Sequence, residues 1–284
     1  MTKLKKKKNA FKRKSNRTNI FPWKYLFIAF FIAGFTFSVY YKEEVKIVYY
    51  KIKATYINYK KRYASKTEQS KKDKIIKHYE DNIFGIDVSH YQGIINWKQV
   101  QFLEDSIPIY FAIMRATAGD TKNDKYFKYN WREAKNRNIK RGAYHYYRPN
   151  ENSTKQAENF IDRVKLEKGD IVPILDIEEE PVIQSIASLR KGIKNWLQIV
   201  EKEYGVKPII YTGDSFYKDY LKGKGFEDYS FWIANYNKNR LKPKMNKWLI
   251  WQFSDQGKVA GINTFVDLNV FDGNAKHFEF LLVK

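Results

Sequence analysis

The segment Asp170–Glu180, DIVPILDIEEE, begins as a buried strand and ends in acidic residues. An apolar run over 171–175 leads directly into Asp176 and Glu178. Because side chains alternate along a strand, these two carboxylates leave it on one face, about 6.6 Å apart at ~3.3 Å per residue. Carboxylates in such a place must reach water or find polar partners. The segment therefore predicts a buried strand whose carboxyl end carries chemistry.

Seven other short runs of β-branched or aromatic residues resemble this strand in length and composition. Helical periodicity over 125–138, 153–166 and 185–204 separates the earlier runs, whereas the last two connections are too short for full helices. The eight candidate strands are FGIDVS from Phe84, IYFAIMRAT from Ile109, KRGAYHYY from Lys140, IVPILDIE from Ile171, KPIIYT from Lys207, YSFWIANY from Tyr229, WLIWQFS from Trp248 and FVDLNVF from Phe265.

The alternation of strands and helices predicts an α/β fold with a parallel sheet. Eight strands in about 200 residues fit a compact α/β barrel, and a doubly wound open sheet is the alternative. Gly85 precedes the first acid and Gly93 stands alone, so no glycine-rich phosphate loop follows the first strand. Nucleotide chemistry is therefore disfavoured.

Charge is distributed unevenly along the 284 residues, whose net charge is +22. Residues 1–82 hold 22 Lys and Arg against 6 Asp and Glu, while the remainder holds 31 against 25. The remainder also lacks a nucleic-acid recognition motif, so we expect no nucleic-acid partner. The absence of cysteine excludes disulfides, cysteine-ligated metals and a thiol nucleophile. His90 and His145 lack metal-ligand spacing, and no metal or other cofactor is predicted.

The N-terminal region predicts a membrane anchor. Ten Lys and Arg between Lys3 and Lys24 precede the apolar run Tyr25–Tyr41, which meets the lower limit of about 17 residues for crossing a bilayer. The positive flank should stay cytoplasmic, which would carry the rest of the chain across the membrane. A cleavable signal peptide is the alternative, but the run ends in SVYYKEE and lacks a small-residue cleavage site.

Four regions follow from these patterns. We expect a basic cytoplasmic leader over 1–24, a transmembrane helix over 25–41, a stalk over 42–82 and a barrel domain over 83–284. The expected location is the cytoplasmic membrane, crossed once, with the barrel on its extracytoplasmic side.

Polar and aromatic side chains gather where the predicted strands end. In α/β barrels, the functional residues lie at the C-terminal ends of the strands. Four acids and several aromatic rings should therefore meet at one mouth. The residues at these ends are Asp87, His90, Arg115, His145, Tyr146, Tyr147, Asp176, Glu178, Tyr211, Asn235, Tyr236, Gln252 and Asp267.

This combination suits a sugar polymer. Aromatic faces stack on pyranose rings, and carboxylates and amides bind hydroxyl and N-acetyl groups. Glycoside cleavage needs a protonated acid beside the leaving oxygen. Crowded carboxylates supply one, because like charges held close together cannot all ionise. Each residue alone also fits a structural role, as a helix cap or core side chain, so it is their convergence that favours a glycosidase.

At these residues the sequence resembles the glycoside hydrolase family 25 lysozymes. The motifs that carry the resemblance, over about 83–273, occur in the same order as in that family. The family's members are wall-degrading N-acetylmuramidases with a flattened, irregular β/α barrel, and the resemblance does not cover the leader. The motifs are FGIDVSHYQGIINW, FAIMRATAG, GAYHYYRP, ILDIE, PIIYT, FWIANY, WQFS and VDLN.

The resemblance implies hydrolysis of the β-1,4 bond between N-acetylmuramic acid and N-acetylglucosamine in peptidoglycan. Glu178 would protonate the leaving oxygen, and Asp176 would orient the N-acetyl group or stabilise the charged intermediate. Asp87 and Asp267 match the family's other two carboxylates at the mouth. Whether the N-acetyl oxygen, a carboxylate or water completes the second step stays open. We expect the substrate to be bound by Arg115, Tyr146, Tyr211, Trp232 and Gln252.

Two positions depart from the family pattern. Ala118 in RATAG stands where the family commonly has Glu, and Tyr91 stands where Trp is frequent. Because the four mouth acids remain, we expect activity to survive with altered subsite binding or pH preference. The alternative is a catalytically impaired module that binds glycan and is tethered to the membrane.

Overall fold

The computed structural model describes residues 23–40, 42–237, 242–243 and 248–284. All eight predicted strands are present, and two short strands, β2 (Phe102–Leu103) and β4 (Lys122–Asn123), flank the second of them. The eight are β1 (Ile83–Val88), β3 (Ile107–Ala118), β5 (Lys140–Tyr146), β6 (Ile174–Asp176), β7 (Ile209–Gly213), β8 (Phe231–Ala234), β9 (Ile250–Gly257) and β10 (Val266–Phe271).

These eight strands close into a barrel, because β1 pairs with both β3 and β10. The closed sheet confirms the barrel and excludes the doubly wound alternative. The expectation of a wholly parallel sheet was wrong, since β10 runs antiparallel to β9 and β1. The segment 258–265 that joins β9 to β10 is shorter than the dozen or more residues of a parallel crossover.

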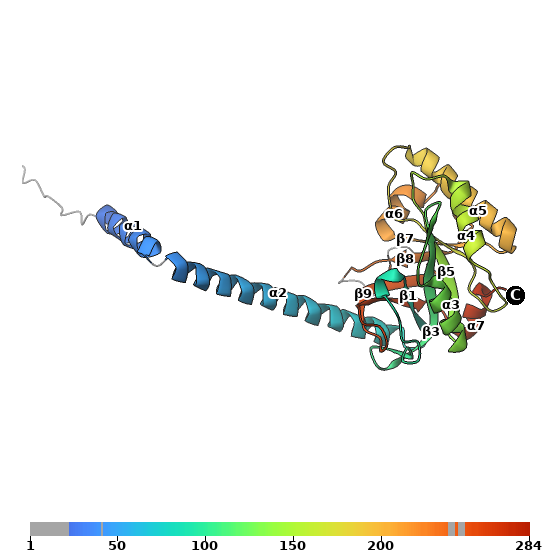
Figure 1. The fold of residues 1–284 in the computed structure, drawn as a ribbon, viewed down its shortest axis with the longest axis horizontal. Coiled ribbons are helices and arrows are strands. Elements are labelled where there is room, and N and C mark those ends of the chain that lie inside the picture. The colour runs from blue at the N-terminus through green and yellow to red at the C-terminus, as the bar shows by residue number, and fades with distance from the viewer. Residues whose placement is uncertain (1–22, 41, 238–241, 244–247) are drawn as a thin grey trace, which may run out of the picture. The chain divides into compact units, whose positions relative to one another are not determined.

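Three helices cover the outside of the barrel (Figure 1), and they confirm the three periodic segments. They are α3 (Phe127–Asn136), α4 (Ser153–Arg163) and α5 (Ile186–Tyr204). The side chain of Asn152 accepts hydrogen bonds at the start of α4, and Gly205 ends α5 at a φ of 68°, which favours glycine. The shorter helical turns are η1 (His90–Gln92), α6 (Asp214–Phe216), η2 (Tyr217–Leu221), α7 (Ala275–Phe278) and η3 (Glu279–Leu281).

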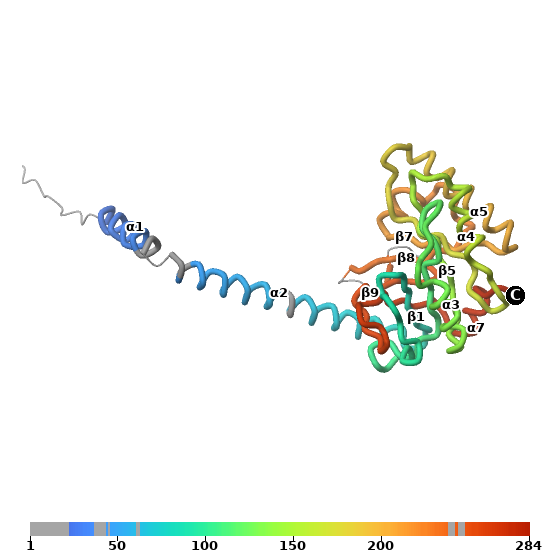
Figure 2. Tube along the Cα trace, in the orientation of Figure 1, coloured from blue at the N-terminus to red at the C-terminus, as the bar shows by residue number. Residues whose placement is uncertain are grey.

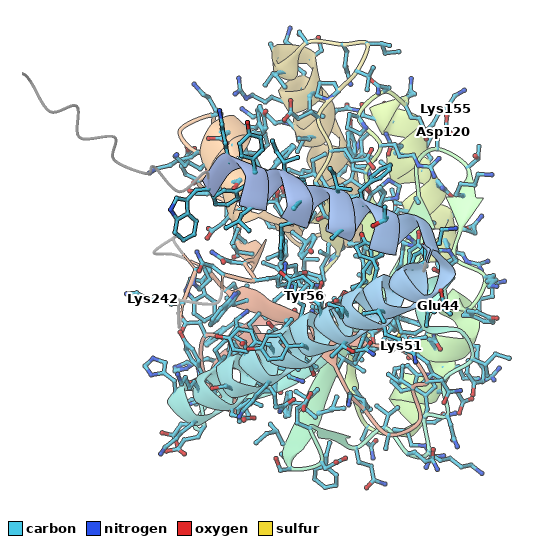
Figure 3. The ribbon with its side chains drawn as sticks, turned by 90° about the vertical axis from the view of Figure 1, so that its left-hand side faces the viewer. Glu44, Lys51, Tyr56, Asp120, Lys155 and Lys242 are labelled. Atoms are coloured by element: carbon cyan, nitrogen blue, oxygen red, sulfur yellow. The ribbon has the colours of Figure 1, made fainter. Side chains whose placement is uncertain are left out.

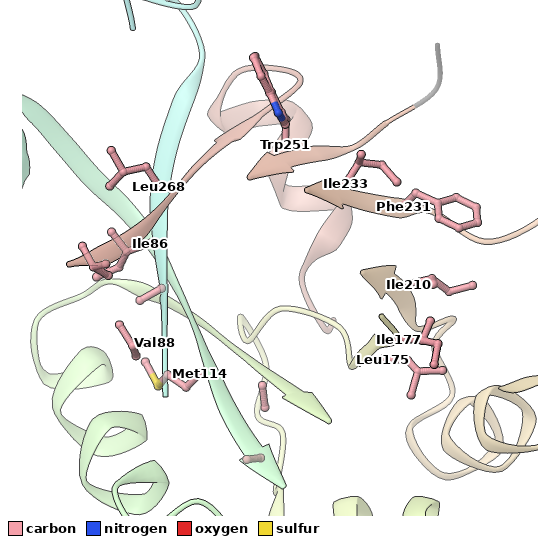
Figure 4. Close-up of a cluster of buried hydrophobic side chains, with 14 of the residues drawn as sticks. Ile86, Val88, Met114, Leu175, Ile177, Ile210, Phe231, Ile233, Trp251 and Leu268 are labelled. Atoms are coloured by element: carbon pink, nitrogen blue, oxygen red, sulfur yellow. The ribbon is translucent and has the colours of Figure 1, made fainter. Parts of the chain in front are cut away.

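The strands carry apolar side chains on both faces. Ile174 belongs to the cluster inside the barrel, while Leu175 and Ile177 belong to the cluster between the strands and the helices (Figure 4). Because side chains alternate, Asp176 and Glu178 follow Ile174 toward the inside of the barrel. The alternation that buries this strand on both faces therefore also directs its two acids to the mouth.

Two helices precede the barrel: α1 (Trp23–Tyr40) and α2 (Lys42–His78). The chain divides into two units, Met1–Tyr63 and Ala64–Lys284, so the last turns of α2 belong to the same unit as the barrel (Figure 2). In the first unit, the side chains of Lys51 and Tyr56 are exposed on α2 (Figure 3).

The predicted membrane segment 25–41 falls on α1, except for residue 41, which lies outside the described residues together with 1–22. Among the residues that the structure describes, no helix combines the length and the apolar character required to cross a membrane.

Candidate active site

The four predicted acids come from three strands whose ends meet at one rim of the barrel. Asp87 lies near the end of β1, and Asp176 ends β6, with Glu178 two residues later. Asp267 lies at the start of β10 and is the register partner of Asp87. It reaches this rim because β10 runs against its neighbours, which places its N-terminal end beside the C-terminal ends of the parallel strands.

Asp87 and Asp267 form the first carboxyl pair. Burial raises the pKa of Asp87 to about 6, although hydrogen bonds from Asn269, Gln252 and Asp267 lower it. Burial raises the pKa of Asp267 to about 9, and the negative charge of Asp87 and the hydrogen bond between the two groups contribute to this rise. Asp267 therefore holds the proton of the pair and donates it in a hydrogen bond to Asp87.

Asp176 and Glu178 form the second carboxyl pair, in which Asp176 is buried and Glu178 is exposed. Burial raises the pKa of Asp176 well above its ordinary value, and the charge of Glu178 and a hydrogen bond to that group raise it further. Partial desolvation raises the pKa of Glu178, while the hydrogen bond from Asp176 lowers it. Oδ1 of Asp176 is buried without a hydrogen-bond partner among the described residues. Burying an unpaired oxygen costs less for a neutral carboxyl group than for an ionised one, which also favours the protonated form of Asp176.

Two amide side chains hold Asp87 in place. Gln252 on β9 donates from Nε2 to Oδ2 of Asp87 at 2.7 Å, and Asn269 on β10 donates to the same oxygen at 2.8 Å. The Tyr211 hydroxyl donates to Oε1 of Gln252 at 2.7 Å, and the Tyr236 hydroxyl donates to the same oxygen. The Gln252 amide is therefore fixed in turn by two hydroxyl groups, so the position of Asp87 is set from several strands.

Trp232 supports another residue of the site. Its side chain is 1% exposed, and its indole Nε1 donates to Oδ1 of Asn269 at 2.8 Å. Its ring also packs against Tyr211, with 4.4 Å between the centroids. A ring covered in this way presents no face to a sugar in this structure, so the sugar contact expected of Trp232 stays a prediction, and what the structure shows is its support of Asn269. Tyr211 and Gln252 are also buried and support Asp87.

Arg115 on β3 organises a polar cluster at the rim. Its Nε donates to Oδ2 of Asp124 at 3.2 Å, and the same oxygen accepts the backbone N–H of His90 at 2.8 Å. The guanidinium group also contacts the His90 ring and lies over the Tyr91 ring, 5.4 Å from its centroid. Tyr91 is 72% exposed. The cluster therefore holds an aromatic ring in solvent, where a sugar can stack on it.

Tyr146 lies between the second carboxyl pair and the position that departs from the family pattern. It is the register partner of Asp176 on β6 and of Ala118 on β3. Its hydroxyl donates to Oε1 of Glu179 at 2.6 Å. Ala118 brings no carboxylate to this place, and the effect expected from that departure stays a prediction.

His145 is not at the mouth. It is fully buried on the outer face of β5, where its ring stacks on Trp196 with 5.5 Å between the centroids. Oε1 of Gln156 accepts the backbone N–H of Arg148, so the 3.1 Å contact with His145 has Nε2 as the donor. Nδ1 then accepts the hydroxyl of Thr117 at 2.7 Å, and burial lowers the pKa of His145 to about 4. His145 is thus a satisfied core histidine.

Asn269 and Asp124 are site residues that the sequence analysis missed. Asn269 had a signal, because it follows Asp267 by two residues in VDLNVF and so shares its face of the strand. Asp124 lies in a loop, where no periodicity marks it. In the described part of the chain, no group of His, Cys, Asp or Glu has the arrangement to hold a metal ion.

Comparison with known proteins shows the family to which the chain belongs. The model of the family described as glycosyl hydrolases family 25 matches residues 86–262. An uncharacterised protein of Escherichia coli K12, YegX, is 41% identical over 198 residues, which cover 69% of this chain and 72% of that protein. Lysozyme M1 of Streptomyces globisporus is 33% identical over 204 residues, covering 67% of this chain and 68% of that protein.

Two solved structures share the fold. A family 25 glycosyl hydrolase from Bacillus anthracis is 32% identical with a TM-score of 0.62, covering 71% of this chain and 94% of that one. A bacterial lysozyme from Streptomyces coelicolor is 31% identical with a TM-score of 0.64, covering 71% of this chain and 97% of that one. The chain is a glycosidase that belongs to glycosyl hydrolase family 25.

Proposed function

We propose that this enzyme is a membrane-anchored muramidase that cleaves the β-1,4 bond between N-acetylmuramic acid and N-acetylglucosamine in peptidoglycan. The observation that carries the proposal is the pair of proton-sharing carboxyl groups, Asp176 and Glu178, at a rim that also holds Asp87 and Asp267. The family membership and the lysozymes among the relatives support the choice of substrate.

Glu178 is the general acid in this proposal. It is the exposed member of its pair, so a leaving oxygen can reach it, whereas Asp176 is buried. The one proton of the pair rests on Asp176 in the free site, and it passes along their hydrogen bond to Glu178, which delivers it to the leaving oxygen. Asp176, then ionised, assists by orienting the N-acetyl group or by stabilising the positive charge that develops on the sugar.

Sugar binding is assigned to the exposed part of the rim. Tyr91 offers an aromatic face, and Arg115 and Asp124 fix it from behind. Tyr146 is half-buried beside Asp176 and can contact the sugar with its ring while its hydroxyl is held by Glu179. Asp87 and Asp267 add hydrogen-bonding groups whose single negative charge suits a cationic transition state.

Incubation of the detergent-solubilised full-length chain with purified peptidoglycan tests the proposal. We expect fragments with new reducing N-acetylmuramic acid ends, identified by mass analysis. Glu178→Gln should abolish their release, and Glu203→Gln, which changes an exposed acid at the end of α5, should not. Equal release by Glu178→Gln and the native chain refutes the acid role. Saturable glycan binding without any product from the native chain would instead support the glycan-binding alternative.

The anchor is a separate part of the proposal. Phe27, Phe30, Phe31 and Phe35 on α1 are all exposed, in a segment that follows the basic leader. Such side chains are stable in a hydrocarbon phase, and the basic flank favours a cytoplasmic N-terminus and an extracytoplasmic barrel. Cell fractionation tests this: the full chain should stay in alkali-washed membranes, and a chain lacking residues 1–41 should not. Recovery of both in the soluble fraction would refute the anchor.

A further inference from the structure

One side of the barrel is covered by a helix from outside the family match. The outward side chains of Trp251 and Phe253 on β9 are fully buried, although the connections on either side of this strand contain no helix in their described parts. The cover comes from the end of α2 and the turn after it. Ile75 and Tyr79 are buried in the same apolar cluster, and the Tyr79 ring lies 6.0 Å from that of Trp251.

Three charged side chains of α2 are also buried against β9. Glu68 Oε1 accepts the hydroxyl of Ser254 at 2.9 Å. Nζ of Lys71 donates to the backbone carbonyl of Phe253 at 2.6 Å, and Nζ of Lys72 donates to the carbonyl of Gln256 at 3.1 Å. Each of the three is at most 6% exposed. Burying charge is costly unless it is well bonded, and Lys72 also forms an ion pair with Glu104 at 2.5 Å. A simple apolar cover for the barrel would not need lysines that bond to carbonyls of β9.

The carbonyls that the lysines bind belong to two bulges of β9. In the ladder with β10, Leu268 pairs with Ser254 and Asn269 pairs with Gln252, which leaves Phe253 as an extra residue. Val266 pairs with Gly257, so residues 255 and 256 of β9 lie opposite a single residue of β10, Asp267. These two residues form a second bulge. A bulge bends its strand and redirects the side chains beside it. Lys71 thus bonds to the first bulge and Lys72 to the second.

Both bulges are adjacent to groups of the active site. The first lies beside Gln252 and Asn269, which both donate to Asp87. The second lies opposite Asp267, which shares a proton with Asp87. Without the bulges, the register of β9 against β10 would shift, and Gln252 would no longer stand across from Asn269.

We propose that Lys71 and Lys72 are positioning residues of the active site, which fix the two bulges of β9 so that Gln252, Asn269 and Asp267 converge on Asp87. This inference rests on the proposed function of the site. It makes residues 64–82 a part of the working enzyme, although the family model matches only 86–262.

Lys71→Met in the full-length chain tests the proposal, because methionine keeps the length of the buried stem and removes the donor. The matched control is Lys74→Met, which changes an exposed lysine less than one turn away. We expect Lys71→Met to lower kcat on peptidoglycan by about 10-fold to 100-fold with KM little changed, as displaced catalytic groups do. We also expect its acidic pH limit to shift, because the hydrogen bonds to Asp87 change, while Lys74→Met keeps the native values.

The contrary outcome is defined by the same measurements. Equal kcat and pH profiles for the two variants would overturn the proposal, even if Lys71→Met melts at a lower temperature, since that result would show a purely structural role. If Lys71→Met does not fold, Lys72→Met, which removes the donor to the Gln256 carbonyl of the second bulge, is compared with Lys74→Met in its place.

Failure of the proposed function gives a different result. An inactive native chain would refute the muramidase and leave the positioning role measurable by ¹³C NMR titration of the Asp87 carboxyl group, assigned with Asp87→Asn. A changed titration in Lys71→Met, with the native one in Lys74→Met, would then support positioning. An unchanged titration in both would overturn it.

Discussion

Asp87 and Asp267 stand directly opposite each other across the antiparallel pair of β1 and β10, and burial together with the charge of Asp87 raises the pKa of Asp267 to about 9. β1 opens the barrel sequence and β10 closes it. The pair therefore exists only when the first and last strands meet, so closure of the barrel and assembly of the site are one event. Because each carboxyl pair retains a proton, Asp87 with Asp267 and Asp176 with Glu178 together carry less negative charge than four ionised carboxylates would.

Asp267→Asn is expected to stabilise the protein at alkaline pH. The pKa of Asp267 is about 9 in the folded state, far above its ordinary value, so the folded state binds a proton that the unfolded state releases. This contribution is present in acid and is lost as the pH rises through about 9. An asparagine keeps a donor for Asp87 without ionising. Its advantage in unfolding free energy, about 0.5–2 kcal/mol, should be greater at pH 9 than at pH 4 in urea titrations. An advantage independent of pH would contradict this account.

Asp176→Asn is expected to lower kcat by about 100-fold or more and to move the basic limit of kcat/KM to lower pH. Burial and the charge of Glu178 raise the pKa of Asp176, so this residue retains the proton of its pair as the pH rises. Asparagine removes that proton and leaves Glu178 to titrate alone, with its smaller rise in pKa. A pH–rate series on soluble peptidoglycan fragments measures the limit. An unchanged basic limit would show that the two carboxyl groups do not share the catalytic proton.

Trp232→Phe separates positioning from sugar contact. The substitution keeps an aromatic ring and removes the Nε1 donor to Asn269. The net value of one hydrogen bond is about 1 kcal/mol, so kcat should fall by about fivefold with KM little changed. Tyr91→Ala is the contrasting variant, because it removes an exposed ring, and KM should rise. Steady-state kinetics that show a raised KM for Trp232→Phe would instead support the sugar contact expected from the sequence.

Acid stability should depend on His145. The folded state holds this residue neutral between Thr117 and Gln156, and burial lowers its pKa to about 4. Unfolded histidine binds a proton below about 6.5, so stability is lost as the pH falls from about 6.5 toward 4, by up to about 3 kcal/mol. His145→Gln cannot titrate and should lose less stability than the native chain between pH 7 and pH 4 in urea unfolding. Equal losses would exclude His145 as the cause.

The eight strands and three covering helices were predictable because their signals are local. Apolar runs of β-branched and aromatic residues mark each strand, and Asn152 and Gly205 mark helix ends by short-range hydrogen bonding and backbone conformation. The direction of β10 was predicted wrongly, because a preceding pattern of parallel crossovers was extended to a connection too short for one. His145 was expected at the mouth but lies on the outer face of β5, because side chains alternate along a strand and its neighbours Tyr144 and Tyr146 point inward.

The sequence by itself determined which acids this protein has, on which strands they lie and which face of the strand each occupies, because side-chain alternation is a property of the local backbone. Only the tertiary structure decided how those acids share protons, that Trp232 is covered, and that α2 reaches the strand that carries Gln252. These features depend on register, burial and contact between segments far apart in the chain. A pKa follows from what surrounds a carboxyl group in space, and that surrounding forms only when the barrel closes.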